Sequence, residues 1–427
     1  MKALSLRDYS LILSGLLIYL LTALPILAAV FYALVRYPKL MFLAVVALTP
    51  FSLNVEPASG TSFYFPTEPL IVAIMGLYLL SHLVNPAFDQ RVFRHPLTML
   101  ILLNLLWILV CTFTSALPVV SLKFFLMRLW YVVVFYFMAL DIFRYFGHIR
   151  HFLLVLLVST ALVVTYATLH HVAIGLNQNN AGAAPGPFFK DHTIYGATIA
   201  LLIPVAFGFV FRQLPFGTTK WQRYLVLSIT PVLLTGLFLS FSRAAWVSVL
   251  VVVPLLLIFL LHIRFRTLVI WGVIIGSLIA IFWTPIILFF QENEATSDET
   301  IEAQLQSVYN ISNDASNTER INRWYCAWRM FEDRPVFGFG PGTYEFVYAP
   351  YQRLYQRTKI STNFGNRGNA HSEYLGPLAE FGLLGMLSKL GLLVVSFYKG
   401  MQLYYRGQNL TVRITALTIT LALVTYF

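Results

Sequence analysis

The stretch that decides the fold is NAHSEYLGPLAEFGLLG, residues 369–385. It ends the one long polar segment of the chain and opens a hydrophobic run, so it marks a place where water meets lipid. His371 lies at this boundary. An imidazole is the side chain that can take a proton from a hydroxyl near neutral pH without a large shift of its pKa. A purely structural role for a lone histidine at a helix start is the alternative.

The composition of the whole chain predicts a polytopic membrane protein. Hydrophobic residues make up 58% of the 427 residues and charged residues only 11%, which excludes an ordinary soluble domain. A net charge of +11 would also suit nucleic-acid binding, but the Lys and Arg residues lie mostly in short connections between apolar runs. That placement orients membrane helices, so no nucleic-acid partner is expected. Cys111 and Cys326 show neither metal-ligand spacing nor a disulfide framework, and we interpret them as packing residues.

Apolar runs predict an all-α fold of about twelve transmembrane helices, since a crossing takes about 20 residues. The first run has basic residues on both sides and is expected to be a hairpin that turns near Pro25; the alternative is a single crossing with the N-terminus on the outer side. The predicted runs are 9–35, 40–53, 69–84, 97–113, 124–140, 152–170, 193–211, 224–240, 244–261, 267–289, 372–397 and 412–427.

Connections rich in Lys and Arg alternate with connections poor in them, and the basic set is expected to be cytoplasmic. The basic residues are Arg91, Arg94, Arg144, Arg150, Arg212, Lys220, Arg223, Arg264, Arg266, Lys399 and Arg406. The segments left on the outer side, the periplasm of a Gram-negative host, are 54–68, 114–123, 171–192, 241–243 and 290–371. Three parts follow: N-terminal transmembrane helices (1–289), a large periplasmic loop that contains helices (290–371), and C-terminal transmembrane helices (372–427).

The large loop contains a predicted helix with two arginines. Residues 316–319 (SNTE) have the sequence of a capping box, and Pro335 is expected to end the helix. Arg320 and Arg323 would then lie in the first turn, where cations oppose the helix dipole. We interpret this unfavourable placement as a sign of an anionic partner. The GFGPG stretch at 338–342 predicts a rigid turn and lacks the Lys-Ser/Thr pair of a phosphate-binding loop.

Arg243 is the clearest charged residue between two apolar runs, in the stretch FSRAAW (241–246). It can reach lipid headgroups beside Trp246, or its guanidinium can bind phosphate oxygens in a fork. An ionisable group at this depth favours a functional role.

Other candidates lie at further outer helix starts. Lys123 and Arg128 open the run 124–140 and would bind either phosphate or lipid headgroups. His192 follows Asp191, for which a helix cap is the simplest interpretation. Glu373 is a candidate to orient or tune His371, whereas Glu380 is expected to satisfy a buried donor. The outer segments contain no Asp-x-Asp metal motif, so no metal or cofactor is expected and a diphosphate would be neutralised by Arg and Lys.

His371, Ser372, nine residues and then Gly382-x-x-Gly385 form a pattern that resembles the motif of the O-antigen ligases. Together with Ser242-Arg243-x-x-Trp246 and the large loop before the last helices, the chain resembles the O-antigen ligase and polymerase superfamily of bacterial membrane glycosyltransferases. In this resemblance Arg243 matches the first essential arginine, Arg320 or its neighbour Arg323 the loop arginine, and His371 the essential histidine.

The resemblance implies an inverting, metal-independent transfer at the periplasmic face of the bacterial inner membrane. The donor would be a glycan on undecaprenyl diphosphate, and the acceptor a sugar of the lipid A core of lipopolysaccharide. His371 would act as general base, and Arg243 and Arg320 would bind the diphosphate with help from Lys123 or Arg128. A polymerase would use the same donor and a second lipid-linked glycan as acceptor. A membrane transporter and a non-catalytic partner of a polysaccharide export system are further alternatives.

Overall fold

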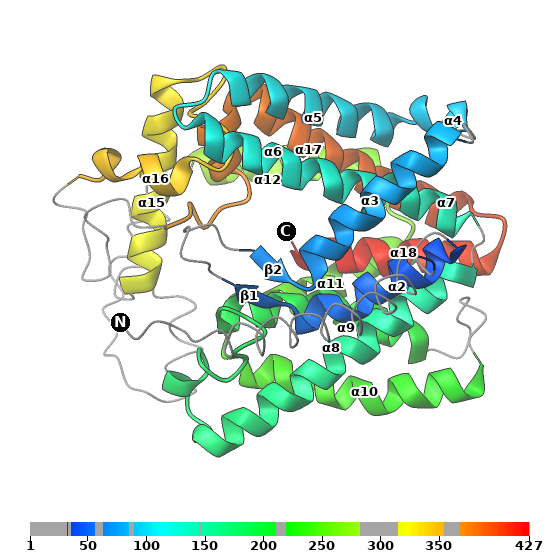
Figure 1. Cartoon of the computed structure of the whole chain (residues 1–427). Coiled ribbons are helices and arrows are strands. Elements are labelled where there is room, and N and C mark those ends of the chain that lie inside the picture. Colours follow the sequence, from blue (N-terminus) through cyan, green and yellow to red (C-terminus); the bar gives the residue numbers. More distant parts are fainter. Residues whose placement is uncertain are drawn as a thin grey trace, which may run out of the picture. The chain divides into compact units, whose positions relative to one another are not determined.

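The computed structural model of the protein describes residues 32, 36–55, 63–84, 89–144, 147–210, 219–281, 315–353 and 368–426 (Figure 1). These residues are mostly helical, which confirms the predicted class. The chain divides into two compact units, Met1–Ala87 with Val133–Val163, and Phe88–Val132 with Val164–Phe427. The boundary predicted at residue 289 lies outside the described residues.

The first unit combines short helices with one hairpin that the all-α prediction did not include. Strands β1 (Leu53–Val55) and β2 (Phe63–Phe65) pair antiparallel with Asn54 opposite Tyr64. Their aromatic and β-branched residues suit a strand better than a helix end. The other elements are α2 (Pro38–Leu48), η1 (Thr49–Phe51), α3 (Thr67–Val84), the π-helix η2 (Val133–Met138), α7 (Ala139–Phe143) and the start of α8 (Gly147–Ile174).

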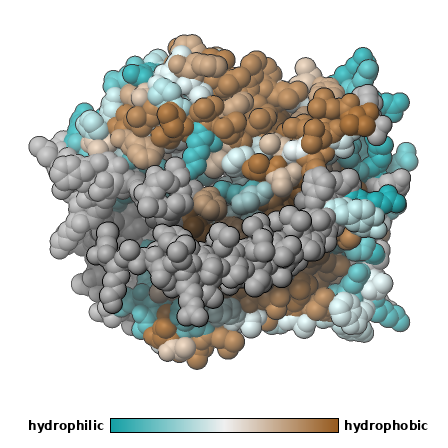
Figure 2. Space-filling model, in the orientation of Figure 1, coloured by the Kyte–Doolittle hydropathy of each residue, from teal (hydrophilic) through white to brown (hydrophobic). Residues whose placement is uncertain are grey.

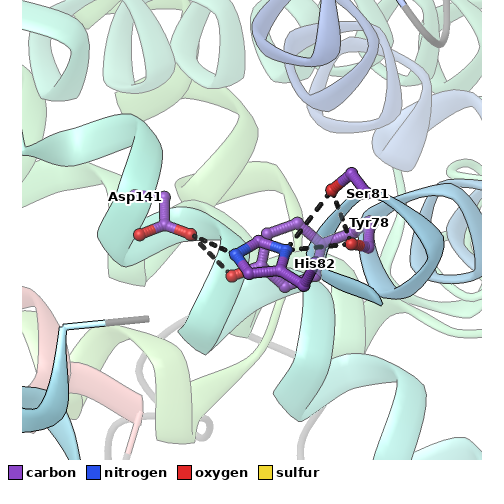
Figure 3. A network of polar contacts seen from close by, with 4 residues as sticks. All are labelled: Tyr78, Ser81, His82 and Asp141. Carbon is purple, nitrogen blue, oxygen red and sulfur yellow. Dashed lines mark hydrogen bonds and ion pairs between the residues drawn. The ribbon is translucent and has the colours of Figure 1, made fainter. Parts of the chain in front are cut away.

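A polar network joins α3 to α7 within the first unit (Figure 3). The Tyr78 hydroxyl donates to Oδ2 of Asp141 at 2.6 Å, and Nε2 of His82 lies 3.6 Å from the same oxygen. Ser81 donates to the Tyr78 carbonyl at 2.7 Å. Because a carboxylate near an apolar helix is costly without partners, we interpret the network as a lock between these two helices.

The second unit holds most of the apolar helices. Its elements are α4 (Gln90–Phe93), α5 (Pro96–Phe113), α6 (Pro118–Val132), the end of α8, η3 (Gln178–Asn180), α9 (His192–Val210), α10 (Lys220–Leu239), α11 (Arg243–Leu260), α12 (Phe265–Ile281), α15 (Ala315–Asp333), α16 (Tyr344–Val347), η4 (Ala349–Tyr351), α17 (Leu375–Arg406) and α18 (Leu410–Tyr426).

Eight helices among the described residues are long and apolar enough to cross a membrane, and three shorter apolar helices accompany them. Figure 2 shows hydrophobic residues over the middle of α5 and α6, with hydrophilic residues gathered toward the helix ends. The protein is therefore a multi-pass membrane protein. The run 9–35 lies almost wholly outside the described residues, so its hairpin and the count of about twelve helices stay predictions.

In the second unit, connections that the charge pattern assigns to the same side of the membrane contact each other. On the predicted outer side, the Ala116 amide between α5 and α6 donates to the Phe339 carbonyl at 2.9 Å. On the predicted cytoplasmic side, His262 after α11 stacks on Tyr405 with 5.3 Å between ring centroids. The two sets of contacts agree with the predicted grouping of these connections, and the assignment of one group to the cytoplasm stays a prediction.

Helix α17 is broken at Gly382, the first glycine of the His-Ser-x9-Gly motif. Gly382 has φ 67° and ψ −168°, which are not helical. The carbonyl groups left free by the break accept hydrogen bonds from the Phe339 amide (3.0 Å), the Gly340 amide (2.9 Å) and the Trp107 indole (2.8 Å). A break inside an apolar helix is tolerated only when other protein groups satisfy its backbone in this way.

The GFGPG stretch forms the predicted rigid turn and lies against this break. Gly338, Gly340 and Gly342 all have positive φ, at 64°, 110° and 70°. At Gly340 a methyl group would overlap the Ser115 hydroxyl, so only glycine fits there. The turn thus lies between the α5–α6 connection and the Gly382 break.

Candidate active site

His371 lies in a short irregular segment between α15 and α17. Its φ of 46° is unusual for a residue with a side chain, and such strain gathers at functional sites. Two backbone contacts hold it: its amide donates to Oδ1 of Asn369 at 3.1 Å, and its carbonyl accepts from the Trp324 indole at 3.4 Å. Ser372 accepts from the Leu375 amide at 3.1 Å and so starts α17. The segment fixes the backbone and leaves the imidazole exposed.

Two arginines and two carboxylates act electrostatically on this imidazole. Partial burial lowers the pKa of His371 below its usual value, and the charges of Arg323 and Arg320 lower it further, against the opposing effect of Asp191 and Glu319. The side chain is therefore neutral at pH 7, which is the form that accepts a proton.

Arg323 and Arg320 differ in their surroundings. Arg323 is buried at 9% exposure, and its Nε donates to Glu319 at 3.0 Å while Nη1 donates to the Asn369 carbonyl at 3.1 Å. A methyl group on Gly368 would come within 2.6 Å of its guanidinium carbon. Arg320 is only half-buried. Arg323 therefore holds the segment before His371, and Arg320 presents a more accessible cation.

The predicted placement of both arginines in a first helical turn is wrong. Helix α15 begins at Ala315, so Ser316 lies inside it instead of capping it, and Arg320 and Arg323 lie beyond the first turn. The unfavourable effect of the helix dipole, from which an anionic partner is predicted, is therefore weak, because it fades within one turn. Pro335 follows the end of the helix at Asp333 as predicted.

The start of α9 joins this cluster. Oδ1 of Asp191 accepts from the amides of Thr193 (2.8 Å) and Ile194 (2.9 Å), which confirms the predicted cap. Burial alone would raise the pKa of Asp191, but these hydrogen bonds and that from the Thr193 hydroxyl lower it, so Asp191 is charged. His192 interacts electrostatically with Arg320, as does His371.

Arg243 begins α11 directly after the tight turn from α10. Phe241 in this turn has φ 48°. The turn packs on α9, where a methyl group on Gly196 would lie 2.9 Å from Cβ of Ser242. The Trp246 indole donates to the Leu237 carbonyl at 2.8 Å and ties α11 back to α10. Arg243 thus starts its helix against the first turns of α9, the helix that His192 opens.

The remaining predicted residues have partners other than His371 or lie exposed. Glu373 forms an ion pair with Lys389, so the structure gives it a partner other than His371. Arg128 lies 5.7 Å from the centroid of the Phe124 ring, and it interacts electrostatically with Tyr426, as Glu373 does. Lys123 is exposed on α6. Sequence reasoning missed Lys389, although a lysine inside the apolar run 372–397 was a usable signal.

Glu380 accepts from the Tyr344 amide at 3.1 Å, which confirms that it satisfies a donor. The two cysteines are buried packing residues, as predicted. Among the described residues, no group of three or more His, Cys, Asp or Glu side chains could hold a metal ion.

Residues 224–389 match the family model described as O-antigen ligase. This part of the chain is similar to the O-antigen ligases. The match includes Arg243, Arg320, Arg323 and His371, together with the Gly382 break in α17. Lys123, Arg128 and His192 precede the matched residues. A comparison with curated proteins found no match.

The match confirms the resemblance drawn from the His371 and Arg243 motifs, and this resemblance suggests glycosyltransferase activity of the ligase or polymerase type. The matched region spans α10 to the first part of α17. It therefore contains both the helix that begins at Arg243 and the segment that carries His371.

Proposed function

We propose that the protein is a glycosyltransferase that moves a glycan from undecaprenyl diphosphate to an acceptor sugar, with inversion and with His371 as general base. The observation that carries the proposal is a neutral, exposed imidazole within electrostatic reach of Arg320 and Arg323, inside the part of the chain that is similar to the O-antigen ligases.

The proposed reaction is a single displacement. The imidazole of His371 takes the proton of the acceptor hydroxyl as its oxygen forms a bond to the anomeric carbon of the donor. The bond from that carbon to the diphosphate oxygen breaks, and its electron pair leaves with the diphosphate. Arg320 and Arg243 bind the departing oxygens, because a guanidinium fork stabilises charge that develops there. Attack opposite the leaving group inverts the anomeric centre.

The remaining candidates have supporting roles in this proposal. Arg323 positions Asn369 and so the segment of His371. Arg128 and Lys123 bind lipid phosphate, His192 acts together with Arg320, with which it interacts electrostatically, and Glu373 pairs with Lys389. No resident cofactor takes part.

The two loop arginines should respond differently to loss of charge. Arg320→Gln should lower transfer by about 10²–10³-fold and leave thermal unfolding of the purified protein nearly unchanged. Arg323→Gln should also destabilise the fold, by about 3–5 kcal/mol, because it breaks the buried ion pair with Glu319. Full transfer activity in Arg320→Gln would remove this residue from the diphosphate site, and unchanged unfolding in Arg323→Gln would contradict its structural role.

The acceptor decides between ligase and polymerase. The His-Ser-x9-Gly-x-x-Gly motif favours the ligase, with the lipid A core as acceptor, because the arginines and the loop are common to both enzymes. The test is reconstitution with purified undecaprenyl diphosphate glycan and rough lipopolysaccharide, offered separately and together. We expect product only when both are present. Product that grows with donor alone would show a polymerase, and no product under any condition would contradict a glycosyltransferase.

We further propose that the protein lies in the bacterial inner membrane, with residues 290–371 as a periplasmic loop between the transmembrane parts 1–289 and 372–427. A cysteine at Val336, which is 50% exposed, should react with a membrane-impermeant thiol reagent once the outer membrane is opened. A cysteine at Lys220 should not react until the inner membrane is opened as well. The background is low because Cys111 and Cys326 are both buried. The reverse pattern would place the site in the cytoplasm and contradict the proposed reaction.

A further inference from the structure

Helix α15 presents an aromatic stripe that the proposed chemistry does not use. Arg320, Trp324, Trp328 and Glu332 recur every four residues and therefore share one face of the helix. Trp324 is 40% exposed and Trp328 is 48% exposed. In Figure 1, α15 runs across the helix ends where α17 begins, so this face lies at the same end as the segment that carries His371.

Both indoles are held in place although their rings are exposed. The Trp324 indole nitrogen donates to the His371 carbonyl at 3.4 Å. The Trp328 indole nitrogen donates to Oε1 of Glu332 at 2.8 Å, and its ring lies 5.6 Å from that of Phe331. Rings fixed by these bonds lose little freedom when a ligand stacks on them.

Within the part of the chain that the structure describes, packing does not explain the stripe. The opposite face of α15 supplies the buried residues Cys326, Ala327 and Met330 of a hydrophobic cluster. Embedding in lipid does not suit it either, because six of the nineteen residues of α15 are charged: Glu319, Arg320, Arg323, Arg329, Glu332 and Asp333. Such a helix belongs to the aqueous side of the membrane surface.

We propose that Trp324 and Trp328 form a saccharide-binding platform continuous with the candidate active site. The inference rests on the proposed function, to which it adds the surface that holds the glycan. The apolar faces of sugar rings stack on exposed indoles, while carboxylates such as Glu332 accept hydrogen bonds from sugar hydroxyls.

The order of residues along the stripe gives the platform a direction. Four residues of α-helix advance about 6 Å, so successive sugars of a chain can contact Trp324 and then Trp328. Arg320 stands at the end of the stripe where the diphosphate is proposed to bind. A glycan that leaves the diphosphate near Arg320 would thus run along α15 toward Glu332.

The test measures binding separately from catalysis. The probe is the lipid-free glycan released by mild acid from the host's lipid-linked donor, titrated into the purified full-length protein by calorimetry. Trp328→Ala should weaken its Kd by about tenfold or more, as expected for loss of a stacked ring, and Trp328→Phe should restore part of the affinity. Trp324→Ala should act similarly, while Trp328 is the cleaner position because its indole bonds Glu332 and that of Trp324 bonds the His371 carbonyl.

Trp221→Ala provides a matched control, since Trp221 is 70% exposed at the start of α10, away from this stripe, and it should bind as the wild type does. Equal Kd values for the wild type and Trp328→Ala, or no binding by the wild type, would overturn the platform. Quenching of Trp328 by brominated lipids, measured in a variant that keeps this residue as its only tryptophan, would overturn it too and show a lipid contact.

The same protein tests the proposed function independently. In a His371→Ala background, Trp328→Ala should still weaken binding of the lipid-free glycan. Binding that depends on Trp328 in a protein that transfers nothing would support the platform and contradict the glycosyltransferase. Transfer activity in a protein whose glycan binding and KM for donor do not change in Trp328→Ala would support the glycosyltransferase and contradict the platform. Rough lipopolysaccharide, titrated in parallel, shows whether the platform takes the donor or the acceptor glycan.

Discussion

His371→Ala should lower the transfer rate by about 10²–10⁴-fold, the range that a positioned general base contributes. The fold should survive, because the backbone of this residue makes the hydrogen bonds to Asn369 and Trp324, and alanine keeps both. The measurement is product formation in the reconstituted system, beside the thermal unfolding of the same preparation. His262→Ala is the matched control, since His262 is an exposed histidine with positive φ, 56°, after α11.

The pH dependence tests the same assignment. Because burial and the charges of Arg323 and Arg320 lower the pKa of His371 below 6.5, kcat/KM of the wild type should be level near pH 7 and fall at lower pH, as the imidazole becomes protonated. Removal of one cation in Arg320→Gln should raise that pKa, so the acidic fall should begin at a higher pH. Full activity in His371→Ala, or a fall that does not move in Arg320→Gln, would exclude His371 as the base.

The positions of most helices along the sequence could be predicted from hydropathy alone. The predicted run 97–113 corresponds to α5 (Pro96–Phe113), and the run 69–84 to α3 (Thr67–Val84). Lipid makes the apolar requirement uniform along a crossing, so composition is enough to find it. The start of α15 was predicted less well, because a capping sequence at 316–319 also fits inside a helix.

The candidate site was predictable in its residue types but not in its division of roles. Spacing could not separate Arg320 from Arg323, since residues three apart on a helix are neighbours. Burial separates them, because Arg323 is occupied by Glu319 and Asn369. The ion pair between Glu373 and Lys389 depends on the break in α17, which no helical periodicity reveals.

The break in α17 explains why the motif has glycine at position 382. Gly382 adopts φ 67° with ψ −168°, a region essentially restricted to glycine. The Leu383 amide, next in the chain, donates to the Pro335 carbonyl at 2.9 Å. The break therefore anchors the end of α15 to α17 and fixes how far His371, eleven residues earlier, stands from the arginines of α15.

Gly382→Ala should be among the most damaging single changes in the protein, with a loss of more than about 4 kcal/mol of stability. The strained backbone costs alanine about 1–3 kcal/mol, and the added methyl group would overlap the Val336 carbonyl. That carbonyl belongs to backbone that packs on α17 and cannot turn aside as a side chain would.

Gly391→Ala in the same helix is the control. Its methyl group would meet the side chain of Leu100 at 3.5 Å, so helix propensity should make this change neutral or slightly stabilising. Thermal unfolding and yield of the two variants in detergent provide the comparison. Equal stability of Gly382→Ala and Gly391→Ala would show that α17 runs straight through Gly382, and the link from the motif to the position of His371 would be lost.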